Sequence, residues 1–221
     1  MIDSASASSH RRWSTSRYAY VREVPAWTTE EFGSSHEGAV GVLLADGTVP
    51  ASVFFDTGSG ADGQSVSHWS VYDGQIARGP RAAALRAACS CGWNGPEHRL
   101  DWDMIGEQKP AEAAHGTADT CMEDWDTHTA DVEQAAIPLP ETVTVLLAQV
   151  QEQVEKLAKT SPLAAVRAAR RLEVTAEQVG YWPAHDARQD TTAEQAAAAL
   201  GLNEDAARKL MARFGGWSPY R

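Results

Sequence analysis

The sequence predicts an α+β protein, in which a small antiparallel β-sheet domain with a zinc-knuckle-like segment precedes an all-helical, trihelical C-terminal domain. Three observations support this class. Residues 18–72 contain short apolar runs separated by turns that carry Gly and Asp, which is typical of strands. Residues 141–214 carry apolar side chains at intervals of three and four, the period of helices. All three cysteines lie between these stretches, at positions 89, 91 and 121.

The N-terminal elements are predicted from composition and turns. Residues 1–17 are rich in Ser, Thr, Arg and Ala without an apolar period, and we expect a disordered tail. Residues 40–44 and 49–55 flank Asp46-Gly47, a dipeptide suited to a tight turn, and this predicts a β-hairpin. Residues 67–72 are predicted to form a third strand. We therefore expect residues 18–137 to form one β-rich, acidic domain with a Cys/His knuckle.

The C-terminal helices are predicted from residues that typically begin or end a helix. A helical linker is expected over 138–160, and a helix-turn-helix-like domain over 161–221. Ser161-Pro162 is typical of a helix start, and this helix is predicted to end near Trp182-Pro183. A Thr-capped helix should then run to residue 200, where Gly201 ends it, and Asn203 should cap a last helix that reaches residue 214.

Composition and charge exclude several classes of protein. No apolar stretch approaches the ~20 residues of a membrane-spanning helix, and an odd number of cysteines fits a reducing compartment. We expect a cytoplasmic protein without a membrane partner. The net charge is −11, with 9 basic and 21 acidic residues in 1–150 but 10 and 9 in 151–221. Because acidic surfaces repel phosphates, any contact with nucleic acid must come from the C-terminal third.

The motif Cys89-Ser-Cys91-Gly-Trp93 is the strongest chemical signal in the chain. Two thiolates in a tight turn followed by glycine are suited to a soft cation such as Zn²⁺. Cys121, His128, His115, His98 and Asp124 are candidates for the remaining ligands. A continuous helix would separate Cys121 from His128 by about 10 Å along its axis. Two other interpretations remain open: buried apolar cysteines, or a redox pair.

The same segment resembles a knuckle that recurs in uncharacterised proteins of high-GC actinobacteria, in which Cys-x-Cys-Gly-Trp precedes a helix with Trp-x-x-His. Here the second part is Trp125 and His128. The resemblance covers about 40 residues, from the first cysteine to the histidine of the motif. It implies no activity. It implies Cys89, Cys91 and His128 as zinc ligands and leaves the fourth open. We choose Cys121 for the softness of its sulfur.

Residues 194–210 resemble the helix-turn-helix of bacterial transcription regulators. Ala197 is small where two helices would cross, and Gly201 supplies the turn. The resemblance implies a second helix that presents Asn203, Arg208, Lys209 and Arg213 to duplex DNA. Glu204 and Asp205 depart from the usual polar or basic residues of such a helix. A trihelical packing or protein-interaction module therefore remains open.

One segment invites an enzyme interpretation. Residues 53–59 place Asp56-Thr-Gly-Ser after an apolar strand and resemble the active-site turn of pepsin-like aspartic proteases. That mechanism needs two carboxylates that share one proton. The sequence has no second Asp-Thr-Gly or Asp-Ser-Gly, so only a homodimer could supply the pair. We expect that the protein is not an enzyme.

These observations predict a DNA-associated regulatory or accessory protein, active in transcription regulation. It would bind duplex DNA through its C-terminal domain. The acidic N-terminal domain, stabilised by zinc, would bind a protein partner or self-associate. The first alternative is an adaptor that never contacts DNA, and the second is the homodimeric protease with Asp56.

Overall fold

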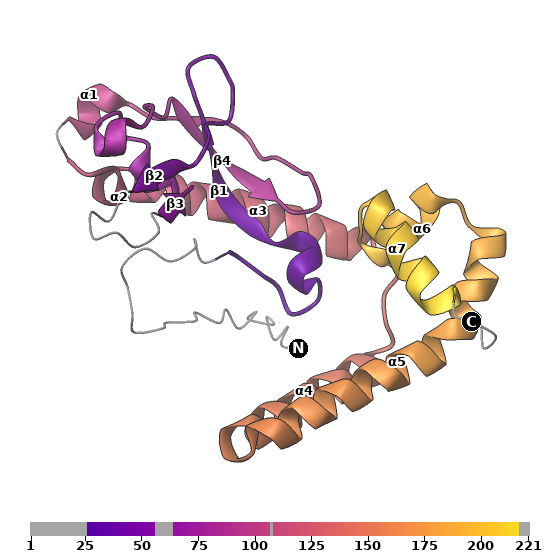
Figure 1. Cartoon of the computed structure of the whole chain (residues 1–221). Helices are drawn as coiled ribbons and strands as arrows, with labels where there is room; N and C mark the ends of the chain where they lie inside the picture. Colours follow the sequence, from indigo (N-terminus) through magenta and orange to yellow (C-terminus); the bar gives the residue numbers. More distant parts are fainter. Residues whose placement is uncertain (1–25, 56–63, 107, 217–221) are drawn as a thin grey trace, which may run out of the picture. The chain divides into compact units, whose positions relative to one another are not determined.

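The computed structural model describes residues 26–55, 64–106 and 108–216 (Figure 1). The predicted tail 1–17 and Asp56 therefore lie outside the described residues. The chain divides into two compact units, Met1–Thr129 (unit 1) and Ala130–Arg221 (unit 2). The described residues form two small antiparallel sheets and seven α-helices, most of the helix in the C-terminal part, which confirms the α+β class.

Unit 1 is built on a three-stranded antiparallel sheet with the strand order β1-β4-β5. Its strands are β1 (Gly38–Leu43), β4 (Ala84–Cys89) and β5 (His98–Arg99). A separate pair consists of β2 (Val53–Phe55) and β3 (Gln64–Val66). The unit also has three 3₁₀ turns. η1 (Gly33–His36) precedes β1, and η2 (Trp69–Val71) and η3 (Ile76–Arg78) lie between β3 and β4.

The predicted strand pairing is wrong, although the turn itself forms. The Leu44 amide donates to the Thr48 carbonyl at 2.9 Å, and Asp46 Oδ1 accepts from the Thr48 amide at 3.0 Å. The chain beyond this turn does not return along β1; Pro50, which has no amide hydrogen, lies there. β1 pairs instead with β4, from Gly38 opposite Cys89 to Leu43 opposite Ala84.

The prediction of a third strand over 67–72 is also wrong. This segment contains the 3₁₀ turn η2, because the His68 side chain caps it by accepting a hydrogen bond from the Ser70 amide. Trp69 and Tyr72 are both buried, so the apolar residues that suggested a strand face the core from a turn. Alternation over a few residues does not distinguish the two conformations.

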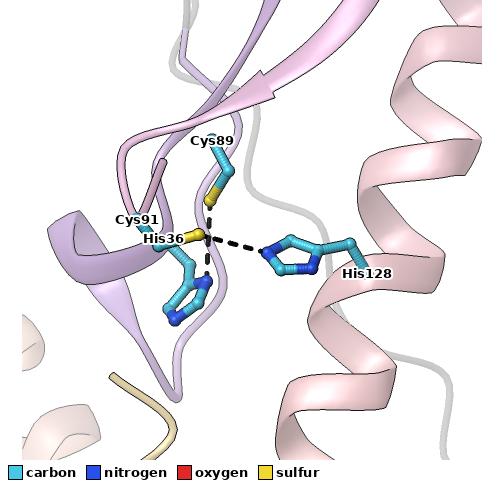
Figure 2. A group of neighbouring side chains, drawn as sticks. All are labelled: His36, Cys89, Cys91 and His128. Atoms are coloured by element: carbon cyan, nitrogen blue, oxygen red, sulfur yellow. Dashed lines mark hydrogen bonds between the residues drawn. The ribbon is translucent and has the colours of Figure 1, made fainter. Parts of the chain in front are cut away.

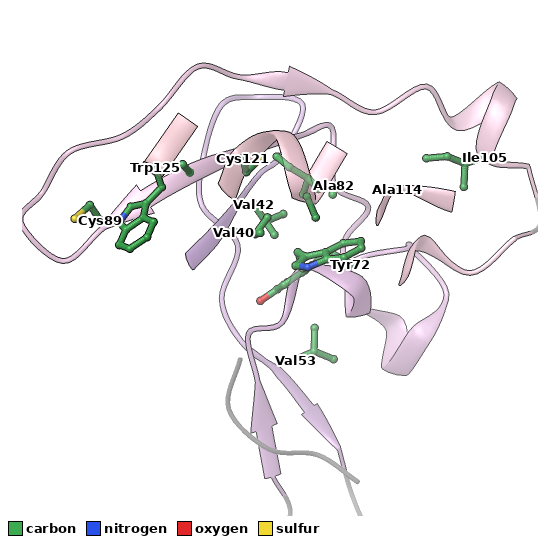
Figure 3. Close-up of a cluster of buried hydrophobic side chains, with 14 residues drawn as sticks. Val40, Val42, Val53, Tyr72, Ala82, Cys89, Ile105, Ala114, Cys121 and Trp125 are labelled. Atoms are coloured by element: carbon green, nitrogen blue, oxygen red, sulfur yellow. The ribbon is translucent and has the colours of Figure 1, made fainter. Parts of the chain in front are cut away.

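Three helices follow the sheet in the sequence: α1 (Trp102–Ile105), α2 (Pro110–Ala113) and α3 (His115–Ala135). α3 buries one face, which consists of Ala118, Cys121, Trp125 and Thr129. The first three of these residues belong to the buried core of the unit, together with Val40, Val42, Tyr72 and Leu85 (Figure 3).

Trp125 lies directly against β1 at Gly38. A Cβ atom at Gly38 would lie 2.5 Å from Trp125 Nε1, so only glycine permits this approach. Trp27 covers the other side of the contact, with its ring centroid 5.8 Å from that of Trp125. α3 is thereby fixed on the sheet near the point where Gly38 pairs with Cys89.

Unit 2 contains α4 (Glu141–Thr160), α5 (Pro162–Asp190), α6 (Ala193–Leu200) and α7 (Glu204–Gly215). α4 packs along α5, and α7 packs on both α5 and α6. The predicted caps are confirmed: Thr192 and Gln195 form a capping box, and Asn203 Oδ1 accepts from the Ala206 amide at 2.8 Å. Among the described residues, no helix is long and apolar enough to cross a membrane.

The division between the units at 129/130 lies within α3, which continues to Ala135, and α4 packs as part of unit 2. One helix end differs from prediction. α5 does not end near Trp182-Pro183 but continues through Pro183 to Asp190. Ala184 is buried, and the α7 backbone at Gly215 approaches it closely, so helix packing outweighs the hydrogen bond that Pro183 cannot donate.

Candidate metal centre

Four side chains from three separate segments of unit 1 converge on one point (Figure 2). His36, Cys89, Cys91 and His128 each offer a ligand atom, and these atoms all lie within 4.8 Å of one another. His36 Nδ1 is 3.5 Å from Cys89 Sγ, and Cys91 Sγ is 3.4 Å from His128 Nε2. Sulfur and nitrogen ligands on one tetrahedral ion, at about 2.3 and 2.0 Å from it, would be about 3.5 Å apart. The cluster could therefore hold a metal ion.

The two cysteines are positioned by a tight turn at the end of β4. The Cys89 amide donates to the Trp93 carbonyl, and the Gly92 amide donates back to the Cys89 carbonyl, both at 2.9 Å. The Trp93 amide points at Cys91 Sγ, 3.4 Å away. A backbone donor to a sulfur stabilises the thiolate form, which is the form that binds metals.

His36 is brought to the cysteines by Ser90, the residue between them. The Ser90 hydroxyl donates to the Ser34 carbonyl at 3.0 Å and accepts from the Glu37 amide at 2.9 Å. The Ser90 amide also donates to the Glu37 carbonyl at 2.8 Å. These three hydrogen bonds flank His36 on both sides and hold η1 against the cysteine turn.

His128 is positioned by α3 and by an aromatic neighbour. It follows Trp125 by three residues, so the contact of Trp125 with Gly38 places His128 on the adjoining part of the helix surface. The ring of Trp93 stacks on that of His128, with centroids 4.2 Å apart and an interplanar angle of 2°. Phe32 lies beside His36 in a tilted arrangement at 4.8 Å.

The site is mostly shielded from solvent, and this burial affects the pKa of the Cys91 thiol. His36 and Cys89 are buried, while Cys91 and His128 are partly exposed. Burial, followed by the neighbouring Cys89, raises the pKa of the Cys91 thiol to about 11 in the metal-free protein. A metal ion must therefore displace the proton of Cys91 when it binds, which makes its affinity fall as the pH falls.

Cys121, predicted as the fourth ligand, does not belong to this group. It precedes His128 by seven residues on the continuous helix α3, about 10 Å along its axis. Its side chain is fully buried among the apolar residues of the core (Figure 3). Burial and, after it, the charge of Asp124 raise the pKa of this thiol to about 12. His36 takes the place that the sequence assigned to Cys121.

His36 was missed because nothing in its local sequence marks it as a ligand. It is one of seven histidines, in the polar segment Gly33-Ser-Ser-His36, and it precedes Cys89 by 53 residues. The pairing of β1 with β4, together with the hydrogen bonds of Ser90, brings it to the cysteines. Two other histidines that were candidates have acidic partners instead: His98 lies 2.6 Å from Asp124, and His115 lies 2.9 Å from Asp119.

The predicted DNA-binding residues all lie on or next to α7 in unit 2. Asn203 is its N-cap, and Arg208, Lys209 and Arg213 are exposed on its surface. Each of the three basic side chains has an acidic neighbour within the unit. Arg208 lies 2.6 Å from Glu204, Lys209 lies 2.6 Å from Asp205, and Arg213 lies 3.9 Å from Glu177.

No protein-family model, curated protein or solved structure matches the chain.

Proposed function

We propose that this chain is a non-enzymatic zinc protein, in which one Zn²⁺ bound by His36, Cys89, Cys91 and His128 stabilises unit 1. The observation that carries the proposal is the convergence of two sulfur and two nitrogen ligands within 4.8 Å. Thiolates with imidazoles are a donor set that zinc prefers over magnesium or calcium. The predicted alternative of buried cysteines without a metal does not account for two histidines beside them.

A structural role is favoured over a catalytic one. Catalytic zinc sites keep one coordination position open for water or substrate, whereas structural sites use four protein ligands. Here four side chains are available, and two of them are buried. Zinc bound to all four would connect η1, the cysteine turn and α3. Because these ligands come together only in the folded chain, the binding free energy of the ion would add to the stability of unit 1.

Metal analysis of the purified protein tests this proposal. We expect one zinc per chain by elemental mass spectrometry after extensive dialysis. Cys91→Ser should retain less than a tenth of that amount, because serine is a poor zinc ligand at neutral pH. Cys121→Ala is the matched control: it also removes a thiol from unit 1, but one that lies outside the cluster, and it should keep the metal. Wild-type protein without zinc after reconstitution would contradict the proposal.

Duplex DNA binding through unit 2 is a second candidate. It is favoured by the pairing of α6 with α7 through a three-residue turn, in which Gly201 adopts the left-handed conformation at φ 61° that glycine permits. Ala197 and Ala207 are buried in this helix pair, and the start of α7 is exposed. Small residues at a helix crossing and a short turn are what a helix-turn-helix requires.

The acidic side chains on α7 should limit the affinity for duplex DNA. Glu204 and Asp205 partly neutralise Arg208 and Lys209, and the hydrogen bond from Lys209 lowers the pKa of the Asp205 carboxyl, so both members are charged at neutral pH. We predict weak, salt-sensitive binding by the wild type. Glu204→Gln/Asp205→Asn should bind a duplex at least about tenfold more tightly at low salt, because it removes two charges that repel phosphates.

Fluorescence anisotropy with a labelled duplex, titrated with salt, measures this effect. Arg208→Ala/Lys209→Ala is the matched variant on the same helix. It should reduce the slope of log affinity against log salt concentration by an amount that corresponds to up to about two phosphate contacts. If neither the wild type nor Glu204→Gln/Asp205→Asn binds at low salt, α6 and α7 form a packing or protein-interaction module.

A further inference from the structure

Trp125 carries a buried hydrogen-bond donor that has no partner. Among the described residues, its indole Nε1 is the buried side-chain nitrogen that forms no hydrogen bond. The residue is only 3% exposed, so bulk water does not reach it. An indole N–H can only donate, and tryptophans in a core normally find an acceptor, as Trp102 does at 2.6 Å from the Ala82 carbonyl. A buried donor without an acceptor is costly and requires a specific explanation.

The orientation of the indole follows from its contact with Gly38. Three ring atoms of Trp125, Nε1, Cδ1 and Cε2, would all lie 2.5 to 2.6 Å from a Cβ atom at Gly38. Because these distances are nearly equal, the Cβ position lies over the face of the ring and not along its N–H bond. The N–H bond therefore points along the surface of the sheet. The Gly38 carbonyl lies in the plane of the sheet, where it accepts from the Trp27 amide.

Cys89 is the residue of β4 beside the indole. It pairs with Gly38, and paired residues of neighbouring strands place their side chains on the same face of the sheet. The Gly38 amide and carbonyl both bond to Trp27, at 2.8 and 2.7 Å, so Gly38 and Cys89 form a non-hydrogen-bonded pair, the kind with the closest side chains. Cys89 and Trp125 lie at the same end of the buried cluster, with the indole nitrogen on the side of the ring that faces Cys89 (Figure 3).

Two groups flank Trp125 on this surface, and they differ as acceptors. The ring of Trp27 is tilted by 46° against that of Trp125, with the centroids 5.8 Å apart. An aromatic face is a weak acceptor. A cysteine that binds a metal is a thiolate, and a charged sulfur accepts hydrogen bonds more strongly than a neutral group. The acceptor that the Trp125 N–H lacks would therefore arise when Cys89 binds the ion.

We propose that Trp125 is a positioning residue of the metal centre, whose indole N–H donates a hydrogen bond to the Cys89 thiolate in the metal-bound protein. This inference rests on the zinc site proposed above. A donor to a ligating sulfur fixes its orientation and withdraws charge from it. The Trp93 amide already has this position at Cys91, 3.4 Å from its sulfur. Each cysteine would then have one N–H donor, and Trp125 would connect Cys89 to α3, which also carries His128.

Nuclear magnetic resonance of the full-length chain, loaded with a spin-active isotope of cadmium, tests the proposal. Cadmium is a soft dication that replaces zinc in thiolate sites. We expect a scalar coupling between the metal and the indole proton of Trp125, because an N–H···S hydrogen bond to a metal-bound sulfur transmits such a coupling. The indole proton should also shift downfield relative to the metal-free protein. Its signal is assigned by its absence from the spectrum of Trp125→Phe.

Trp125→Phe and Trp27→Phe form a matched pair, because each replaces one of two neighbouring indoles. In Trp125→Phe the zinc dissociation constant should rise about tenfold. The sulfur-to-metal charge-transfer band of the cobalt-loaded variant should move to longer wavelength, since a sulfur without a hydrogen bond donates electrons more readily. Trp27→Phe should keep the band and the affinity of the wild type. A purely structural role of Trp125 would change the affinity but not the band.

The outcomes separate this inference from the zinc site. A chain that binds cadmium fully but shows no coupling to the Trp125 proton would overturn the role of Trp125 and leave the metal site intact. A chain that takes up neither cadmium nor zinc would overturn the zinc site and, with it, this inference. If Trp125→Phe does not fold, the coupling in the wild type still decides, with the indole proton assigned from its contact with the Trp27 ring.

Discussion

Chelating the metal is expected to lower the melting temperature of unit 1 by about 20 °C while the helices of unit 2 stay folded. Zinc bound with a nanomolar dissociation constant, at about micromolar free metal, would stabilise the folded unit by about 4 kcal/mol. Its removal would also leave the buried His36 and Cys89 without the ion that we propose they bind. The loss should therefore be confined to the unit that contains the cluster.

Two spectroscopic readouts separate the units. Tryptophan fluorescence reports mainly unit 1, which contains six of the eight tryptophans, Trp93 and Trp125 beside the cluster among them. Far-UV circular dichroism reports mainly the long helices of unit 2. Adding zinc back should restore the fluorescence transition, and adding magnesium should not. Cys91→Ser provides the control, since chelator should have no further effect on a variant that already lacks the metal. Identical melting of the wild type with and without chelator would show that the metal does not stabilise unit 1.

His36→Ala and Cys121→Ala should differ in zinc binding, although both variants should still fold. His36→Ala removes a ligand, and we expect the zinc affinity to fall more than about 100-fold, beyond the 10- to 100-fold typical of residues that only support a ligand. Cys121→Ala should keep one zinc per chain. It should cost about 1 kcal/mol of unfolding free energy, as for a typical core substitution, because it removes a fully buried sulfur from the packed core.

Competition with a chromogenic zinc chelator measures both affinities under the same conditions. The His36→Gln variant keeps a side chain of similar size without an imidazole, and it should behave like His36→Ala if the role of His36 is ligation. Loss of zinc from Cys121→Ala together with retention in His36→Ala would instead support the ligand set that the sequence suggested.

The helices could be predicted from sequence because their signals are local. Thr192, Gly201 and Asn203 end or begin helices through contacts with residues that are four or fewer positions away. Pro183 was misleading for the same reason. Its local preference is to end a helix, but the contact between α5 and α7 is made by residues distant in sequence.

The sheet and the full candidate ligand set could not be predicted, because they depend on distant pairing. β4 is rich in alanine and has a weak strand signal, yet it is the strand that pairs with β1. That pairing places Gly38 opposite Cys89 and brings His36 to the cysteines. Cys89 and Cys91 could be identified because they are adjacent in a turn, and His128 because it belongs to a recurring motif. Nothing comparable identifies His36.

X-ray absorption at the zinc edge tests most directly the claim that His36, Cys89, Cys91 and His128 bind one ion. For the zinc-loaded protein, we expect two sulfur atoms at about 2.3 Å and two imidazole nitrogens at about 2.0 Å from the metal. In Cys121→Ala the same shell should be unchanged. A shell with three sulfur atoms in the wild type, reduced to two in Cys121→Ala, would contradict the assignment and place Cys121 on the metal.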